Sequence, residues 1–188
     1  MSTLEIIAVI LGVINILLII RRSVWNFPVG IVMVALYCVI FAQSKLYSDA
    51  GLQIFFLAAN AYGWSAWSRN MADAGEVEIL RLSPRANLAW AAGSALAIAA
   101  WGDFMAHYTD ASYPYWDASV AMLSIAAQIL MARRAIDNWH YWIVVNVISI
   151  PLYLVKDLRL TAGLYGVFLI LAIMGLREWS KALRPRAS

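Results

Sequence analysis

Seven apolar stretches, separated by clusters of charged residues, dominate the sequence. Each covers 15 to 19 residues, close to the roughly 20 that an α-helix needs to cross a bilayer. Lipid offers the backbone no hydrogen-bond partners and the stretches lack a two-residue alternation, so helices are predicted rather than strands. The fourth stretch is rich in alanine and gives the weakest pattern. The predicted helices are Leu4–Ile20, Trp25–Ala42, Ala50–Trp67, Leu88–Gly102, Tyr115–Met131, Trp139–Val155 and Thr161–Trp179.

The composition agrees with an all-α integral membrane protein. Of 188 residues, 63% are hydrophobic and only 13% are charged, about half the charge of a soluble domain. The mean hydropathy is +0.73. These values exclude a disordered tail, a nucleic-acid-binding module and a separate soluble domain. The single cysteine, Cys38, cannot close an internal disulfide or supply a thiolate cluster for a metal.

The basic residues predict the orientation in the membrane. Seven spans place the termini on opposite sides, and 11 of the 14 Lys and Arg residues fall in one set of connections, against 3 in the other. The positive-inside rule then places the N-terminus outside and the C-terminus in the cytoplasm. The smaller set is Lys45, Lys156 and Arg159; the larger set is Arg21, Arg22, Arg69, Arg81, Arg85, Arg133, Arg134, Arg177, Lys181, Arg184 and Arg186.

An internal repeat relates the third stretch to the seventh. The shift that carries Gly63 onto Gly175, the repeat shift, gives eight identities in 22 positions. Trp25 opens the second stretch as Trp139 opens the sixth, with the shift changed by two. The alternative is coincidence among common apolar residues. The identities place Leu46, Ala50, Gly51, Leu52, Phe56, Leu57, Gly63 and Trp67 on Leu158, Ala162, Gly163, Leu164, Phe168, Leu169, Gly175 and Trp179.

The repeat predicts three parts: 1–69 is a first three-helix repeat, 70–110 a linker with the fourth helix, and 111–188 a second three-helix repeat. Four spans separate equivalent positions, and this even number gives the two halves the same orientation. Parallel halves are a transporter architecture, with the substrate held near the middle of the membrane.

Polar side chains follow single faces of four predicted helices. Such groups are costly in lipid and normally face the bundle interior or a wet cavity. Amides, a carboxylate and aromatic rings on matching faces suit a flat, cationic, hydroxylated molecule. The faces consist of Asp49, Gln53, Phe56, Asn60, Trp64 and Trp67; Trp139, Trp142, Asn146, Ser149 and Tyr153; Asp117, Ala121, Ser124 and Gln128; and Asn26, Gly30, Met33 and Tyr37.

Structural explanations compete with substrate binding for the same residues. Tryptophans near span ends suit interfacial belts, and amides such as Asn60 and Gln128 can tie helices together. Asp117 stands at a predicted helix start, where a carboxylate is stabilising. A membrane scaffold that uses these faces only for packing is therefore the alternative function. No zinc-binding HExxH or glycine-rich phosphate loop occurs, and no serine has a nearby histidine base in the membrane, so no enzyme, catalytic residue, metal or cofactor is expected.

Three segments together resemble the PnuC family of vitamin transporters. The first runs from Trp25 to Arg69 and includes the run NAYGWSAWSR at 60–69. The second comprises YPYWD at 113–117 and LSIA at 123–126. The third is DNWHYWIVVNVIS at 137–149.

The resemblance implies a 3+1+3 helical fold like that of the SWEET sugar transporters, a homotrimer, and residence in a bacterial inner membrane. It implies facilitated diffusion of nicotinamide riboside, trapped by cytoplasmic phosphorylation. His140 and Pro151 are not typical of the riboside carriers, and thiamine or riboflavin stays open as the substrate. The stripes and the resemblance together give nine candidate substrate-binding residues: Gln53, Asn60, Trp64, Asp117, Gln128, Trp139, Trp142, Asn146 and Tyr153.

Overall fold

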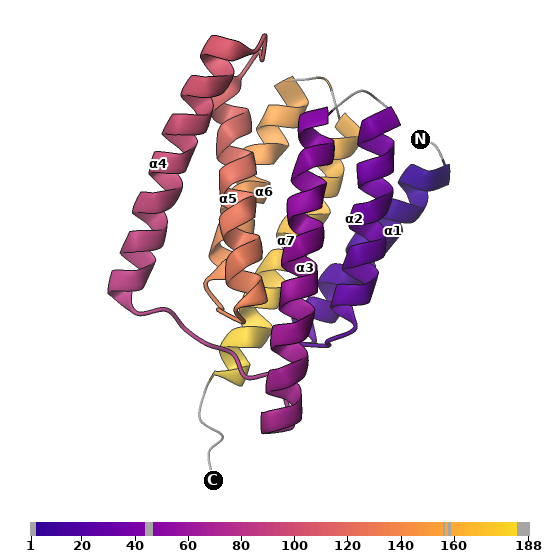
Figure 1. Cartoon of the computed structure of the whole chain (residues 1–188), viewed down its shortest axis with the longest axis vertical. Helices are drawn as coiled ribbons and strands as arrows, with labels where there is room; N and C mark the ends of the chain where they lie inside the picture. Colours follow the sequence, from indigo (N-terminus) through magenta and orange to yellow (C-terminus); the bar gives the residue numbers. More distant parts are fainter. Residues whose placement is uncertain (1–2, 44–46, 156, 158, 184–188) are drawn as a thin grey trace. The chain divides into compact units, whose positions relative to one another are not determined.

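The computed structural model describes residues 3–43, 47–155, 157 and 159–183. This part of the chain forms seven α-helices (Figure 1). They are α1 (Thr3–Ile20), α2 (Asn26–Gln43), α3 (Tyr47–Ala74), α4 (Pro84–Tyr108), α5 (Pro114–Ala132), α6 (Asn138–Val155) and α7 (Arg159–Ala182). The predicted stripe residue Asp49 and the repeat positions Leu46, Ala50, Gly51 and Leu158 lie outside the residues whose side chains are described.

All seven predicted helices are confirmed, and the main differences concern the ends of α3 and α4. Helix α3 continues to Ala74 although the apolar stretch ends at Trp67, because charge interrupts an apolar run without breaking a helix. Helix α4 begins at Pro84, where the Ser83 hydroxyl accepts a hydrogen bond from the Ala86 backbone N–H at 3.2 Å. A serine cap followed by proline is a favourable helix start, so the capping chemistry extends α4 beyond its apolar centre.

Three described segments are long and apolar enough to cross a membrane: Pro84–Tyr108, Pro114–Ala132 and Thr161–Ala182. They include α4, whose sequence pattern was the weakest of the seven. The shorter segments Ile6–Ile20 and Asn26–Ile40 are also apolar helices. Helices of this length and composition are typical of a multi-pass membrane protein.

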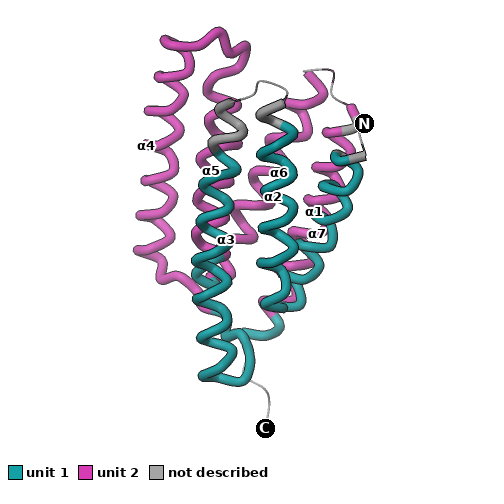
Figure 2. Tube along the Cα trace, turned by 45° about the vertical axis from the view of Figure 1, so that its right-hand side comes forward, with its two compact units in different colours: residues 1–79, 132–134, 181–188 teal, residues 80–131, 135–180 magenta. Residues whose placement is uncertain are grey.

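The chain divides into two compact units, coloured separately in Figure 2. Unit 1 comprises residues 1–79, 132–134 and 181–188, and unit 2 comprises 80–131 and 135–180. In unit 1, α2 packs against both α1 and α3. Helix α4 belongs to the same unit as α6 and most of α5 and α7. The division into 1–69, 70–110 and 111–188 stays a prediction about the repeat.

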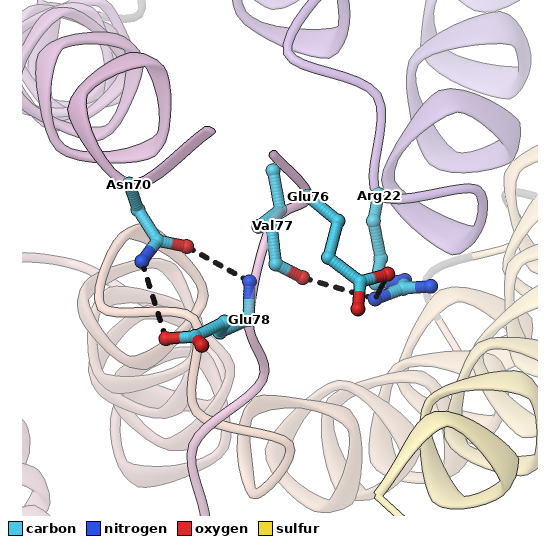
Figure 3. Close-up of polar contacts among 5 residues, drawn as sticks. All are labelled: Arg22, Asn70, Glu76, Val77 and Glu78. Carbon is cyan, nitrogen blue, oxygen red and sulfur yellow. Dashed lines mark hydrogen bonds and ion pairs between the residues drawn. The ribbon is translucent and has the colours of Figure 1, made fainter. Parts of the chain in front are cut away.

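Polar contacts hold the segment that follows α3 in unit 1 (Figure 3). The Arg22 guanidinium donates to the Val77 carbonyl at 3.0 Å and pairs with the Glu76 carboxylate at 3.5 Å. One helical turn before the end of α3, the Asn70 carboxamide accepts the Glu78 backbone N–H at 2.8 Å. The Arg22 contacts fasten the segment to the turn between α1 and α2, and the Asn70 bond fastens it to α3.

The turns that precede α2 and α6 have the same local structure, and the repeat shift relates them without change. Arg22 and Arg134 both adopt a left-handed backbone, with φ of 56° and 64°. At the first residue of each following helix, Asn26 donates to the Ser23 carbonyl at 2.7 Å and Asn138 donates to the Ala135 carbonyl at 2.6 Å. The first residues of α3 and α7 are also related by the repeat shift.

The repeat shift relates an edge-to-face aromatic pair of unit 1 to one of unit 2. Phe27 meets Trp67 with ring centroids 5.1 Å apart, and Trp139 meets Trp179 at 5.6 Å. A glycine of the neighbouring helix lies against each first ring, Gly63 on Phe27 and Gly175 on Trp139. Close packing of a ring on a helix backbone is thus built twice from the same positions.

The position equivalent to Trp139 is therefore Phe27, and the pairing of Trp139 with Trp25 is wrong. Trp25 is 72% exposed, whereas Phe27 is fully buried. Trp25 and Trp139 are the same type of residue, but Phe27 and Trp139 share the buried position at the start of their helices. The repeat shift stays constant from α2 through α3, so no change of two is needed.

Candidate substrate-binding site

Carboxamides gather in the interior of unit 1 from two helices, beside a glycine of the third. Asn60 of α3 is 5% exposed, and its amide donates to the Phe56 carbonyl at 2.8 Å. Asn15 of α1 donates its amide to the Asn26 carbonyl at the start of α2. A side chain at Gly30 would place its Cβ 2.9 Å from the Asn60 Oδ1 and 3.0 Å from the Asn15 Nδ2. The absent side chain of Gly30 thus lets both amides reach the α2 backbone.

Asn15 was missed by the sequence reasoning. It is 8% exposed and is a lone amide within the first apolar stretch. A polar side chain inside a membrane span is itself a signal for an inward-facing position, so the run VINILL could have identified it. It belongs to no repeated motif, and for that reason the stripes did not include it.

The other predicted residues of α3 differ in burial. Gln53 is half-buried, and Trp64 is 42% exposed. Asn60 lies between them on the same predicted face and is buried. The side chains of this face therefore differ in exposure, and the face is not enclosed along its whole length. The Trp64 side chain lies partly at the surface of the described part of the chain.

In unit 2, α6 carries the largest group of candidate residues. Asn146 is 4% exposed and donates its amide to the Trp142 carbonyl at 2.8 Å. Trp142 and Tyr153 are half-buried. The Tyr153 ring lies 5.0 Å from that of Tyr165 in α7. Ser149 is fully buried, and its hydroxyl has no hydrogen-bond partner among the described residues.

Helix α5 adds two polar positions to the buried set of unit 2. Gln128 is 7% exposed and Ser124 is 8% exposed, with the Ser124 hydroxyl bonded to the Val120 carbonyl at 2.7 Å. Asp117 is half-buried in the first turn of the helix, where the helix dipole favours a negative charge. The carboxylate thus has a structural role in addition to its predicted role in binding.

Trp139 lies in the core of unit 2 rather than in an interfacial belt. Its exposed fraction is 2%, and its ring is enclosed by Trp179 and the backbone at Gly175. Trp67 and Trp179 are equally buried. The belt interpretation therefore fails for these three residues and suits only the exposed Trp25.

At three interior positions related by the repeat shift, the two units carry side chains of different size and polarity. The repeat shift maps Asn15, Gly30 and Asn60 of unit 1 onto Ala127, Trp142 and Ala172 of unit 2. Ala127 and Ala172 are both almost fully buried. One unit thus combines two carboxamides with a glycine, and the other combines two alanines with an indole. The repeat keeps its helix ends and aromatic pairs but differs in this interior layer.

Two recesses of unit 2 lie along α4, away from the candidate residues. They measure about 300 and 480 Å³, and small side chains of α4 such as Gly93, Ser94 and Ala95 border them. Neither contains any of the nine candidate residues. Among the residues described, no group of three or more His, Cys, Asp and Glu side chains is arranged to hold a metal.

Comparison with known proteins places the chain among vitamin transporters. A family model described as nicotinamide mononucleotide transporter matches residues 2–181. The nicotinamide riboside transporter PnuC of Escherichia coli K12 is 30% identical over the whole chain and 89% of that protein. The riboflavin/roseoflavin transporter RibM of Streptomyces davaonensis is 28% identical, over 90% of this chain and 81% of that protein.

A solved structure agrees with the family match. The crystal structure of the vitamin B3 transporter PnuC superimposes with a TM-score of 0.80 at 25% identity, covering 97% of this chain and 82% of that one. The family model and the structural similarity both extend over nearly the entire sequence. The chain therefore belongs to the nicotinamide mononucleotide transporter family, as its resemblance to the PnuC proteins predicted.

Proposed function

We propose that the protein is a membrane transporter for a vitamin that carries a flat heteroaromatic ring, with nicotinamide riboside as the foremost substrate. The observation that carries this proposal is the full-length match to a nicotinamide riboside transporter. Buried carboxamides and a half-buried indole on apolar helices support it. Carboxamides hydrogen-bond ribose hydroxyls, and an indole face attracts a pyridinium ring.

The transport mechanism that we propose is facilitated diffusion by two parallel three-helix halves, with α4 as the connection. Support comes from the constant repeat shift, at which helix starts and aromatic–glycine contacts recur. Parallel repeats move against each other around a fixed substrate site. Cytoplasmic phosphorylation then traps the product. A homotrimer with the N-terminus outside and the C-terminus in the cytoplasm completes the proposal.

Riboflavin and thiamine are the competing substrates. The similarity to RibM favours riboflavin, whereas thiamine shares with nicotinamide riboside a flat ring and one positive charge. A cation gains from stacking on an indole, and the uncharged isoalloxazine ring gains only its stacking and burial. The half-buried carboxylate of Asp117 likewise favours the cationic vitamins.

Calorimetric titration of the purified protein tests the substrate. We expect saturable heat with nicotinamide riboside, and at least tenfold weaker binding of its phosphate ester, nicotinamide mononucleotide. The nine candidate residues include one carboxylate and no lysine or arginine, so they offer a phosphate dianion no opposite charge, and an unpaired charge in such a site is costly. Thiamine and riboflavin are titrated in parallel. Silence toward all four compounds would reject the transporter proposal and leave the scaffold alternative.

A further inference from the structure

Helix α6 contains a break in its backbone hydrogen bonding within the stretch that carries the candidate residues. Pro151 lies inside the helix. Proline has no N–H to donate to the carbonyl four residues earlier, and its ring crowds that carbonyl. Sharp bends in helices commonly occur at such positions. Trp142 and Asn146 precede Pro151, and Tyr153 follows it, so a bend here changes how these side chains are oriented relative to one another.

A side chain from α5 bonds to the helix beside this break. The indole N–H of Trp116 donates to the Ile148 carbonyl at 2.8 Å, three residues before Pro151. Trp116 also meets the Tyr113 ring edge-on, with centroids 6.1 Å apart, which fixes the indole from a second side. The bond is partly buried, and a hydrogen bond shielded from water contributes more than an exposed one.

Both halves of α6 are anchored to α7, and Pro151 lies between the anchors. The start of α6 is held by Trp139 against Trp179 and Gly175. The end is held by Tyr153 against Tyr165. The turn just before Pro151 contains Ser149, which is fully buried and has no hydrogen-bond partner among the described residues. Within that turn, the bond from Trp116 ties the backbone to a neighbouring helix.

The first three-helix stretch lacks both parts of this arrangement. The repeat shift places Leu4 at the position of Trp116 and Val39 at that of Pro151. Helix α2 therefore has a backbone N–H at the position equivalent to the proline, and the equivalent residue of α1 has no indole to donate to this helix. The two parts are present together in α5 and α6 and absent together in α1 and α2, which points to a joint function.

We propose that Trp116 is a positioning residue for the substrate site. Its hydrogen bond to the Ile148 carbonyl fixes the bend that Pro151 permits in α6, and this sets the arrangement of Trp142 and Asn146 relative to Tyr153. Trp116 itself contacts no substrate. The inference rests on the proposed transport function, because these α6 residues are the ones expected to bind the vitamin.

The test is a double-mutant cycle between Trp116→Phe and Pro151→Ala, measured as nicotinamide riboside uptake into proteoliposomes. In the natural background, Trp116→Phe removes the donor and keeps a ring, and we expect KM to rise about five- to tenfold, within the range of one hydrogen bond. In the Pro151→Ala background the restored N–H stiffens α6, so the same change should alter KM less than twofold. Trp101→Phe, in α4, is the matched control and should leave KM unchanged.

Hydrogen exchange of α6 separates failure of this proposal from failure of the proposed function. We expect faster exchange at residues 149–155 in Trp116→Phe, but only when Pro151 is present, whether or not the riboside is transported. Equal effects in both backgrounds would show that Trp116 contributes only packing, and would overturn the proposal. Unchanged exchange together with an unchanged KM would overturn it as well. If Trp116→Phe does not fold, Trp116→Leu, which also has no side-chain hydrogen-bond donor, takes its place in the cycle.

Discussion

Replacing Trp142 by alanine is expected to weaken vitamin binding about a hundredfold while leaving the folded protein intact. The indole is half-buried, and losing its face removes both stacking and cation–π attraction, which together contribute on the order of 2–3 kcal/mol. Calorimetry with nicotinamide riboside measures the effect. Trp142→Phe keeps an aromatic face and should recover part of the affinity, whereas Trp142→Leu keeps apolar volume and should not.

The matched control is Trp101→Ala, which removes a 40% exposed indole from α4 and should leave affinity unchanged. Asn146→Ala provides a second test of the same site. The Asn146 amide bonds to the backbone carbonyl of Trp142, which survives in Trp142→Ala, so the two variants report on separate contacts. Affinity within threefold of the parent in both variants, with unchanged unfolding temperature, would show that the vitamin binds elsewhere.

Gly175→Ala is expected to lower the free energy of unfolding by about 1–3 kcal/mol, the usual cost of overpacking. The added methyl group would overlap the Trp139 ring, and this ring cannot withdraw because it is 2% exposed and packed on Trp179. Gly63→Ala should have a similar effect, since Phe27 occupies the equivalent space in unit 1. Thermal unfolding in detergent measures both changes.

Gly163→Ala is the control on the same helix. Apart from the nearby backbone of α7 itself, no atom of the described residues lies within 4 Å of a Cβ placed there. Alanine also favours a helix over glycine by roughly 1 kcal/mol. Its unfolding temperature should therefore match or exceed that of the parent. If Gly175→Ala were as stable as Gly163→Ala, the tight aromatic–glycine contact would not be a feature of the folded protein.

Much of the architecture could be predicted from hydropathy and spacing. The seven helices follow from apolar stretches near bilayer length, because burial of apolar side chains and internal backbone hydrogen bonding are local requirements that each stretch meets by itself. The family resemblance and the repeat shift were also readable from motifs. Among the candidate residues, Asn60, Gln128 and Asn146 are buried as expected of amides inside a membrane span.

Contacts between helices could not be read in this way. Trp139 occurs at a span end, which suggests a belt, yet Gly175 on another helix leaves room for its ring and so places it in the core. Asn15 and Asn60, from two other helices, both approach α2 at Gly30, where a side chain would crowd both amides. The bond from Trp116 to Ile148 joins residues 32 positions apart, and no periodicity within one helix predicts it.

The amino-acid sequence alone thus determined where the helices lie, which family the chain joins and that the amides Asn60, Gln128 and Asn146 are buried. The tertiary structure decided which rings pack on which glycines, which amides lie beside Gly30, and which position of one repeat corresponds to which of the other. These outcomes depend on the sizes of side chains brought together from different helices, and a single helix carries no information about its neighbour's shape.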